Sequence, residues 1–245
     1  MNTIVKTLAV MVALFCMVIA FFLPEKRATA AAFISTVKVI IVDHSERQFI
    51  DSARVVNTLR QADVLSVHGD IDKVNTEAME QVLLKHPMLQ TAEVVVTPSR
   101  QILIEVTQRH PLLRVMGSYG QFFIDEKGAV MPIPKAMMTA LDLPLATGSI
   151  TKEYARKKLY PLARFIANDE FWNAQIVQIY VRSPSQVRLV TRVGNCAIDM
   201  GTADDYENKL GNLYLFYQQA MPKLGWIRYD AINLDYKNQI VCTKK

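Results

Sequence analysis

The feature that most constrains the fold lies between residues 91 and 132, where two strand pairs meet at Arg109-His110-Pro111. Apolar residues recur at every second position in 92–97 and again in 101–106, and Pro98-Ser99-Arg100 separates the two runs. A period of two that is interrupted by turn residues predicts an antiparallel hairpin.

The alternation restarts after the proline. Residues 112–115 and 121–124 form a second apolar pair, and residues 125–128 reverse the chain into 129–131. Gly128 supplies the positive φ that such a reversal needs. One β unit therefore gives way to another at Pro111, and the whole stretch lacks the residue types of a reaction centre. It favours a protein that works by shape and strand pairing.

The N-terminus predicts a membrane anchor. Residues 7–23 carry no charge and, extended by Ile4 and Val5, approach the length of about 20 residues that crosses a bilayer. The alternative is a cleavable signal peptide, because Ala28-Thr29-Ala30 has the form of a cleavage site. Glu25-Lys26-Arg27, just before that site, is unusual in a cleavage region and normal beside a membrane helix. We therefore expect a retained anchor.

The charges beside this anchor do not settle its orientation. Lys6 favours an inside N-terminus, whereas Lys26 and Arg27 favour the opposite arrangement. Because the tail before the anchor is short, almost the whole chain must lie on one side of the membrane, and we expect the outer side.

A small α+β module is predicted after the anchor. Residues 36–42 alternate as a strand, 49–61 have helical spacing, and a second helix begins at Asn75 or Thr76, either of which can cap it. The hairpin follows, so the order is strand, helix, helix, strand, strand. Because the first strand reaches its partners across both helices, we expect a mixed sheet with the two helices on one face.

The remainder is predicted to be rich in β-structure. Helical patterns cover residues 151–168 and 203–220, the second with Thr202 as its cap and Asp204 and Asp205 in its first turn. The predicted strands are 175–182, 186–192, 196–200, 228–236 and 239–243. The last strand ends close to residue 245. A terminal strand at a sheet edge exposes unpaired backbone groups, which can accept a strand from a partner.

Motifs for catalysis or metal binding are missing from the sequence. The four histidines are isolated, and no glycine-rich phosphate loop or nucleophile elbow occurs. Asp125 and Glu126 form a carboxylate pair, but we assign them to a hairpin tip, which offers no burial to raise a pKa. We expect no cofactor, no metal and no small-molecule substrate.

The cysteines and the basic residues each leave two interpretations open. Cys196 and Cys242 could pair if strands brought them together, or could stay as isolated thiols. The net charge is +5, and its densest patch is predicted to be either a solvated helix face or a contact for anionic lipid or an acidic partner. That patch comprises Lys152, Arg156, Lys157, Lys158 and Arg164. Basic and aromatic residues are not interleaved as in nucleic-acid binding.

Several motifs together resemble the FtsQ/DivIB family of bacterial cell-division proteins. The residues that carry the resemblance are 83–87, Val94-Val95-Val96, 102–106, Gln108-Arg109-His110-Pro111, 120–128, 193–201 and Ile232-Asn233-Leu234-Asp235-Tyr236. The chain departs from the family pattern at Gln108, where Glu is usual, and at Asn233 and Asp235, where Asp and Arg are usual. Pro98-Ser99 also shifts the position of the arginine-proline motif in the hairpin turn. A partner that binds through backbone pairing would tolerate the polar changes.

The resemblance implies an α+β, single-pass protein of the inner membrane with its C-terminal domains on the outer face, at the division septum. Its expected parts are residues 1–24 as cytoplasmic tip and transmembrane helix, 25–33 as linker, 34–108 as POTRA domain and 109–245 as β domain. The family's role is a non-catalytic scaffold, which captures FtsB/FtsL-type (DivIC/FtsL) coiled-coil partners by strand addition and links them to the septal synthase. Carried to this chain, the docking residues are Tyr236, Asn238, Gln239, Ile240 and Val241, with Tyr236 as a packing anchor.

Two other functions compete with this one. A POTRA-bearing assembly factor for secreted or outer-membrane proteins would carry repeated POTRA units or a large barrel, and this sequence has one such unit. A membrane-tethered envelope enzyme would need a pocket of convergent polar groups, which the sequence does not indicate.

Overall fold

A computed structural model describes residues 36–42, 49–65, 71–133, 143–193, 196–225, 228–237 and 239–245. The membrane helix that the sequence predicts within residues 1–24 lies outside these ranges. Within them, no helix combines the length and the apolar character needed to cross a bilayer.

The N-terminal module has the predicted strand, helix, helix, strand, strand order. Its elements are β1 (Thr36–Ile41), α2 (Ser52–Gln61), the 3-10 helix η1 (Ile71–Lys73), α3 (Thr76–Leu84), β2 (Leu89–Val96) and β3 (Gln101–Gln108). The sheet order is β1-β3-β2, with β1 parallel and β2 antiparallel to β3. The mixed sheet is therefore confirmed. The chain crosses both helices into β2, which runs opposite to β1, and the hairpin then brings β3 back beside β1 and parallel to it.

Local sequence signals explain the two helices of this module. Asn75 caps α3, its Oδ1 accepting from the N–H of Ala78 at 2.9 Å, as predicted. Met79 and Leu83 are fully buried against the sheet. Val55 and Leu59 of α2 join them, so both helices pack on one face and form a separate core.

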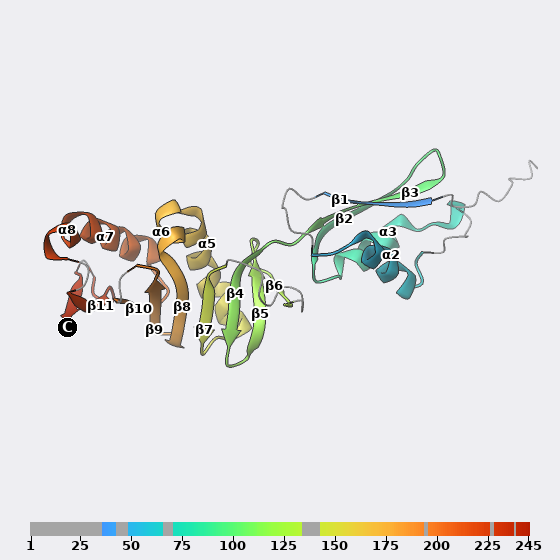
Figure 1. The fold of residues 1–245 in the computed structure, drawn as a ribbon. Coiled ribbons are helices and arrows are strands. Elements are labelled where there is room, and N and C mark those ends of the chain that lie inside the picture. The colour runs from blue at the N-terminus through green and yellow to red at the C-terminus, as the bar shows by residue number, and fades with distance from the viewer. Residues whose placement is uncertain are drawn as a thin grey trace, which may run out of the picture.

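The C-terminal module is built on one large mixed sheet, which confirms the α+β class. Its strands are β4 (Pro111–Gly117), β5 (Gly120–Asp125), β6 (Val130–Met131), β7 (Leu145–Gly148), β8 (Ile176–Ser183), β9 (Gln186–Thr191), β10 (Ala197–Gly201), β11 (Tyr229–Asn233) and β12 (Val241–Lys244). In the described residues the nine strands follow the order β12-β11-β10-β9-β8-β7-β4-β5-β6. Figure 1 shows the two modules end to end, with β6 toward the N-terminal module and the C-terminus at the opposite end.

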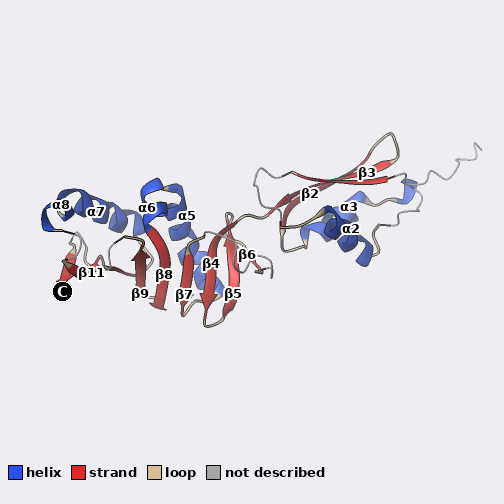
Figure 2. Cartoon of the chain, in the orientation of Figure 1, coloured by secondary structure: helices blue, strands red, loops and turns tan. Residues whose placement is uncertain are grey.

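Helices cover one face of this sheet (Figure 2). They are α4 (Lys152–Tyr154), the π-helical turn η3 (Ala155–Leu159), α5 (Tyr160–Asn168), α6 (Glu170–Gln175), α7 (Tyr206–Gln219) and α8 (Met221–Leu224). Their buried residues, such as Leu162, Ile166 and Leu213, share one core with Ile179 and Leu189 of the sheet. The other face of β8 to β10 carries polar side chains.

Three elements of this module were not predicted: β7, α6 and α8. β7 is short and lies between β4 and β8, parallel to both. So short a run carries too few positions for a recognisable period. Its membership of the sheet is decided by its two neighbours.

The predicted start of the helix at residues 203–220 is wrong. α7 begins at Tyr206, and Asp205 occupies the N-cap position with a left-handed φ of 55°. Asp204 therefore precedes the helix, and its Oδ1 lies 2.6 Å from Nζ of Lys158. Thr202 also lies before the cap. An ion pair to a different helix, rather than the helix dipole, accounts for Asp204.

The expectation that the tip at Asp125 offers no burial is also wrong. Asp125 is only 4% exposed. Its turn role is confirmed, because Oδ1 accepts from the N–H groups of Lys127 at 3.0 Å and Ala129 at 2.6 Å. Nη1 of Arg109, in the connection between the modules, also lies 3.5 Å from Oδ2 of this carboxylate.

Candidate partner-binding edge

β12 forms one edge of the large sheet. It pairs antiparallel with β11, and its other side has no strand partner among the described residues. This confirms that the last strand lies at a sheet edge. We call the unpaired side of Val241–Lys244 the β12 edge.

The ladder to β11 identifies the backbone groups that face outward. The N–H of Lys245 donates to the carbonyl of Arg228 at 3.2 Å, which flanks the pairing of Lys244 with Tyr229. Because successive peptide units of a strand point to opposite sides, Thr243 and Val241 also face β11. The N–H and C=O groups of Cys242 and Lys244 therefore point away from the sheet and are open to a partner strand.

Of the predicted docking residues that the structure describes, Val241 alone lies in this strand. Val241 is its first residue and is 44% exposed. Gln239 and Ile240 precede the strand, so the predicted start of the strand at residue 239 is wrong. Ile240 packs against the core of the C-terminal module. Tyr236 is 56% exposed in the turn before the strand, and its carbonyl accepts from the N–H of Gln239 at 3.3 Å. Asn238 lies outside the described residues.

Tyr236, Gln239 and Ile240 come together at a groove of about 490 Å³ between the β11–β12 turn and the start of α7. On the α7 side, Lys209 lines the groove and donates from Nζ to the carbonyl oxygens of Met200 at 2.8 Å and Thr202 at 3.0 Å. These bonds fix the start of α7 against the end of β10. The groove is thus a mostly polar surface continuous with the turn that precedes β12.

The turn between β11 and β12 packs closely against Gly201. Gly201 ends β10 with φ of 69°, and a Cβ added there would lie 1.9 Å from Oδ1 of Asp235. Asp235 directly precedes Tyr236, so its side chain packs against Gly201 one residue before the exposed tyrosine. Sequence reasoning noted Gly201 only as part of a motif, because the distant contact leaves no local signal.

The two cysteines of this region are free. β11 lies between β10, which Cys196 precedes, and β12, which contains Cys242. Strands are about 4.8 Å apart, so two spacings exceed the Cα separation of about 7 Å that a disulfide tolerates. Burial raises the pKa of Cys196 to about 11 and also raises the pKa of Cys242, so both thiols are protonated at neutral pH.

A second polar surface, which sequence reasoning missed, lies on the face of β8 to β10 away from the helices. Arg188 makes two bonds to Asp199, at 2.6 Å from Nε and 3.1 Å from Nη2, and exposed Tyr180 lies opposite Arg188 in the register. The cross-strand pairs on this face follow from the register of the strands, which the sequence alone does not provide. Within the described ranges, no group of three or more His, Cys, Asp or Glu side chains could hold a metal ion.

Comparison with known proteins gives two family matches. A family model described as FtsQ/DivIB, C-terminal related, matches residues 110–243, and a model of a POTRA-like domain matches residues 33–107. No curated protein matches the chain.

Among solved structures, the chain is similar to the major extracytoplasmic domain of the trans isomer of the bacterial cell-division protein DivIB from Geobacillus stearothermophilus. The two are 16% identical, over 47% of this chain and 97% of that chain, with a TM-score of 0.33. A score of this size is too low to support an argument about fold or function.

Proposed function

Because this chain belongs to the FtsQ/DivIB C-terminal related family of cell-division proteins, we propose that it is a non-catalytic scaffold of the division machinery. Anchored in the inner membrane by its N-terminal apolar segment, it presents both modules on the outer face at the septum. There it recruits FtsB/FtsL-type (DivIC/FtsL) coiled-coil partners and links them to septal peptidoglycan synthesis.

The observation that carries this proposal is the β12 edge. Cys242 and Lys244 offer two N–H donors and two C=O acceptors on the side of β12 where no other strand of the described residues pairs. An extended segment of the partner adds there as a further strand, with main-chain bonds supplying affinity. Side chains on alternate positions then supply specificity.

The predicted docking residues have two roles in this proposal. Val241 opens the edge strand, and Tyr236 is the aromatic anchor beside it, since exposed tyrosines are frequent in the energetic centre of interfaces. Gln239 and Ile240 directly precede the strand. The groove that Tyr236, Gln239 and Ile240 line receives the partner chain where it leaves the added strand.

The test is a proline that removes an outward N–H without removing a bond to β11. Cys242→Pro has this property, because the N–H of Cys242 points away from β11, and its ring also blocks an approaching strand. Each lost hydrogen bond is worth about 1 kcal/mol, so with the steric block we expect binding of the partner to weaken by about tenfold or more. Co-purification of the coiled-coil partner with the full chain from membranes measures the effect.

Cys242→Ala is the matched control, because it removes the same thiol and keeps the N–H. It should co-purify the partner at the parental level. Thermal unfolding of both variants verifies that the β11–β12 ladder is intact. Equal recovery of the partner by folded Cys242→Pro and Cys242→Ala would reject the β12 edge as the docking site.

A further inference from the structure

The connection between the two modules consists of two residues. β3 ends at Gln108 and β4 begins at Pro111, so Arg109 and His110 alone join them. Domains that share a small interface ordinarily move relative to one another. A short connection of this kind is a natural hinge unless contacts on both sides immobilise it.

The backbone of both connecting residues is held, each by a different module. The N–H of Arg109 donates to the carbonyl of Met88 in the N-terminal module at 2.9 Å. The carbonyl of His110 accepts from the N–H of Glu126 in the C-terminal module at 3.0 Å. Pro111 also restricts the backbone of His110 to extended conformations. Rotation at either residue therefore breaks a hydrogen bond.

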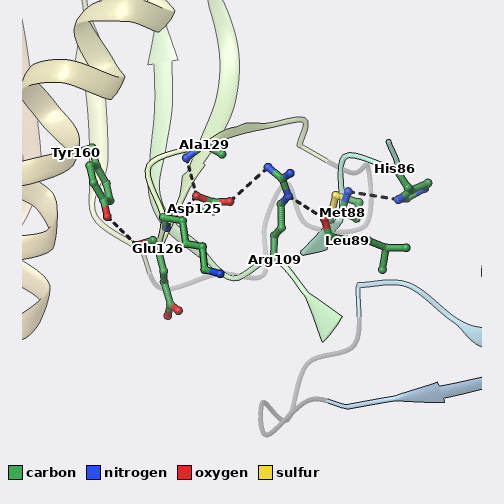
Figure 3. A network of polar contacts seen from close by, with 9 residues as sticks. His86, Met88, Leu89, Arg109, Asp125, Glu126, Ala129 and Tyr160 are labelled. Carbon is green, nitrogen blue, oxygen red and sulfur yellow. Dashed lines mark hydrogen bonds and ion pairs between the residues drawn. The ribbon is translucent and has the colours of Figure 1, made fainter. Parts of the chain in front are cut away.

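The side chain of Arg109 spans the junction (Figure 3). Its Nε donates to the carbonyl of Leu89 at the start of β2 at 2.9 Å, and its Nη1 lies 3.5 Å from Oδ2 of Asp125 at the end of β5. One guanidinium thus contacts both modules. Asp125 is buried, so water screens its contact with the guanidinium only weakly.

A small apolar cluster closes the same junction. Met88 from the N-terminal module is buried with Phe123 and Met131 of β5 and β6. The ring of Phe49 adds to this cluster and meets His110 edge-on, with centroids 6.5 Å apart. The two modules therefore share apolar contacts as well as the ion pair.

Gln108 explains how Phe49 is held in this place. Its side chain is fully buried, and Oε1 accepts from the N–H groups of Ile50, at 2.9 Å, and Phe49. A neutral amide satisfies these donors without burying a charge. The glutamine that departs from the family pattern is therefore suited to its surroundings.

We propose that Arg109 is a positioning residue that locks the two modules into one rigid rod. Its guanidinium is the part that bridges both sides, since the planar fork reaches a carbonyl and a carboxylate at once. The rod holds the β12 edge at a constant distance from the N-terminal module; this consequence rests on the proposed function, whereas the lock itself does not.

The test is the distribution of distances between the modules in the full chain. Spin labels on genetically encoded residues at Glu77, exposed on α3, and Gln218, exposed on α7, leave the native cysteines untouched. Pulsed electron paramagnetic resonance should give one narrow distance peak for the parent. In Arg109→Ala we expect that peak to become at least about twofold wider, because the guanidinium contacts with Leu89 and Asp125 are lost.

Two further variants make the outcome unambiguous. Arg109→Lys keeps the charge and the aliphatic stem but lacks the fork, so it folds like the parent and should also widen the peak. Arg156→Ala removes an exposed arginine far from the junction and should leave the peak unchanged. If Arg109→Ala unfolds on a thermal melt, Arg109→Lys decides. Parental widths in folded Arg109→Ala, or in Arg109→Lys where the alanine variant unfolds, would overturn the lock.

Partner capture is measured separately on the same variants. The width of the distance peak involves no partner, so loss of the docking proposal would leave the lock standing. Conversely, a widened peak with unaltered co-purification would leave the lock standing. It would show only that partner capture does not depend on a constant distance between the β12 edge and the N-terminal module.

Discussion

At the scale of single residues, Gly201 is the sharpest constraint near the candidate edge. Its φ of 69° and the close Asp235 carboxylate leave no room for a Cβ. In Gly201→Ala the backbone is strained and the turn that carries Asp235 must shift. We expect the free energy of unfolding to fall by about 1–3 kcal/mol, measured by urea denaturation.

Gly211 provides the matched control for this substitution. It lies inside α7, and a Cβ there would meet nothing within 4 Å. Gly211→Ala should therefore raise the stability by about 0.5–1 kcal/mol, since glycine is unfavourable within a helix. Equal effects of the two substitutions would contradict the role assigned to Gly201.

At the scale of elements, α3 depends on its N-terminal cap. Asn75→Ala removes the acceptor for the N–H of Ala78 and leaves that donor to water. We expect the N-terminal module to lose about 1 kcal/mol of stability, measured by chemical denaturation. Gln81→Ala, at an exposed position of the same helix, should be nearly neutral. A neutral Asn75→Ala would show that α3 is held by packing alone.

At the scale of the whole molecule, the two modules have separate cores. Leu83 is fully buried in the N-terminal core, which shares no buried residue with the core of the C-terminal module. Leu83→Ala should cost about 2–5 kcal/mol. Hydrogen exchange should rise in β1 to β3 and stay unchanged in β8 to β11, with partner capture preserved.

Leu189→Ala is the reciprocal variant, because Leu189 is fully buried in the core of the C-terminal module. It should raise exchange in that module and weaken partner capture, while the N-terminal module keeps its protection. A single exchange response shared by both modules in either variant would show that they unfold as one unit.

The sequence allowed the N-terminal module to be predicted almost completely. Its strands alternate, its second helix has a capping asparagine, and its hairpin has a clear turn, so each signal lies within a few residues of what it determines. β7 escaped because its place depends on two neighbouring strands. The start of α7 was predicted too early because Asp204 and Asp205 resemble helix-start charges, whereas Asp204 pairs with Lys158.

The candidate site was predicted only in part, for the same reason. The edge position of β12 follows from the strand order of the sheet. The register with β11 determines which residues of β12 face outward. These are Cys242 and Lys244, which were not among the predicted docking residues. The groove beside Tyr236 requires α7, which lies far away in sequence.

Periodicity and turn residues act over short distances, so the amino-acid sequence was enough to predict the strand and helix order of the N-terminal module, the change of β unit at Pro111 and the last strand. The tertiary structure alone decided which backbone groups of β12 stay open and that Arg109 bridges Leu89 and Asp125. Those partners lie 20 and 16 positions away along the chain, so only the packing of the two modules brings the charges and carbonyls together. The junction at Arg109-His110-Pro111 could thus be located from the local sequence pattern, whereas its contacts could not.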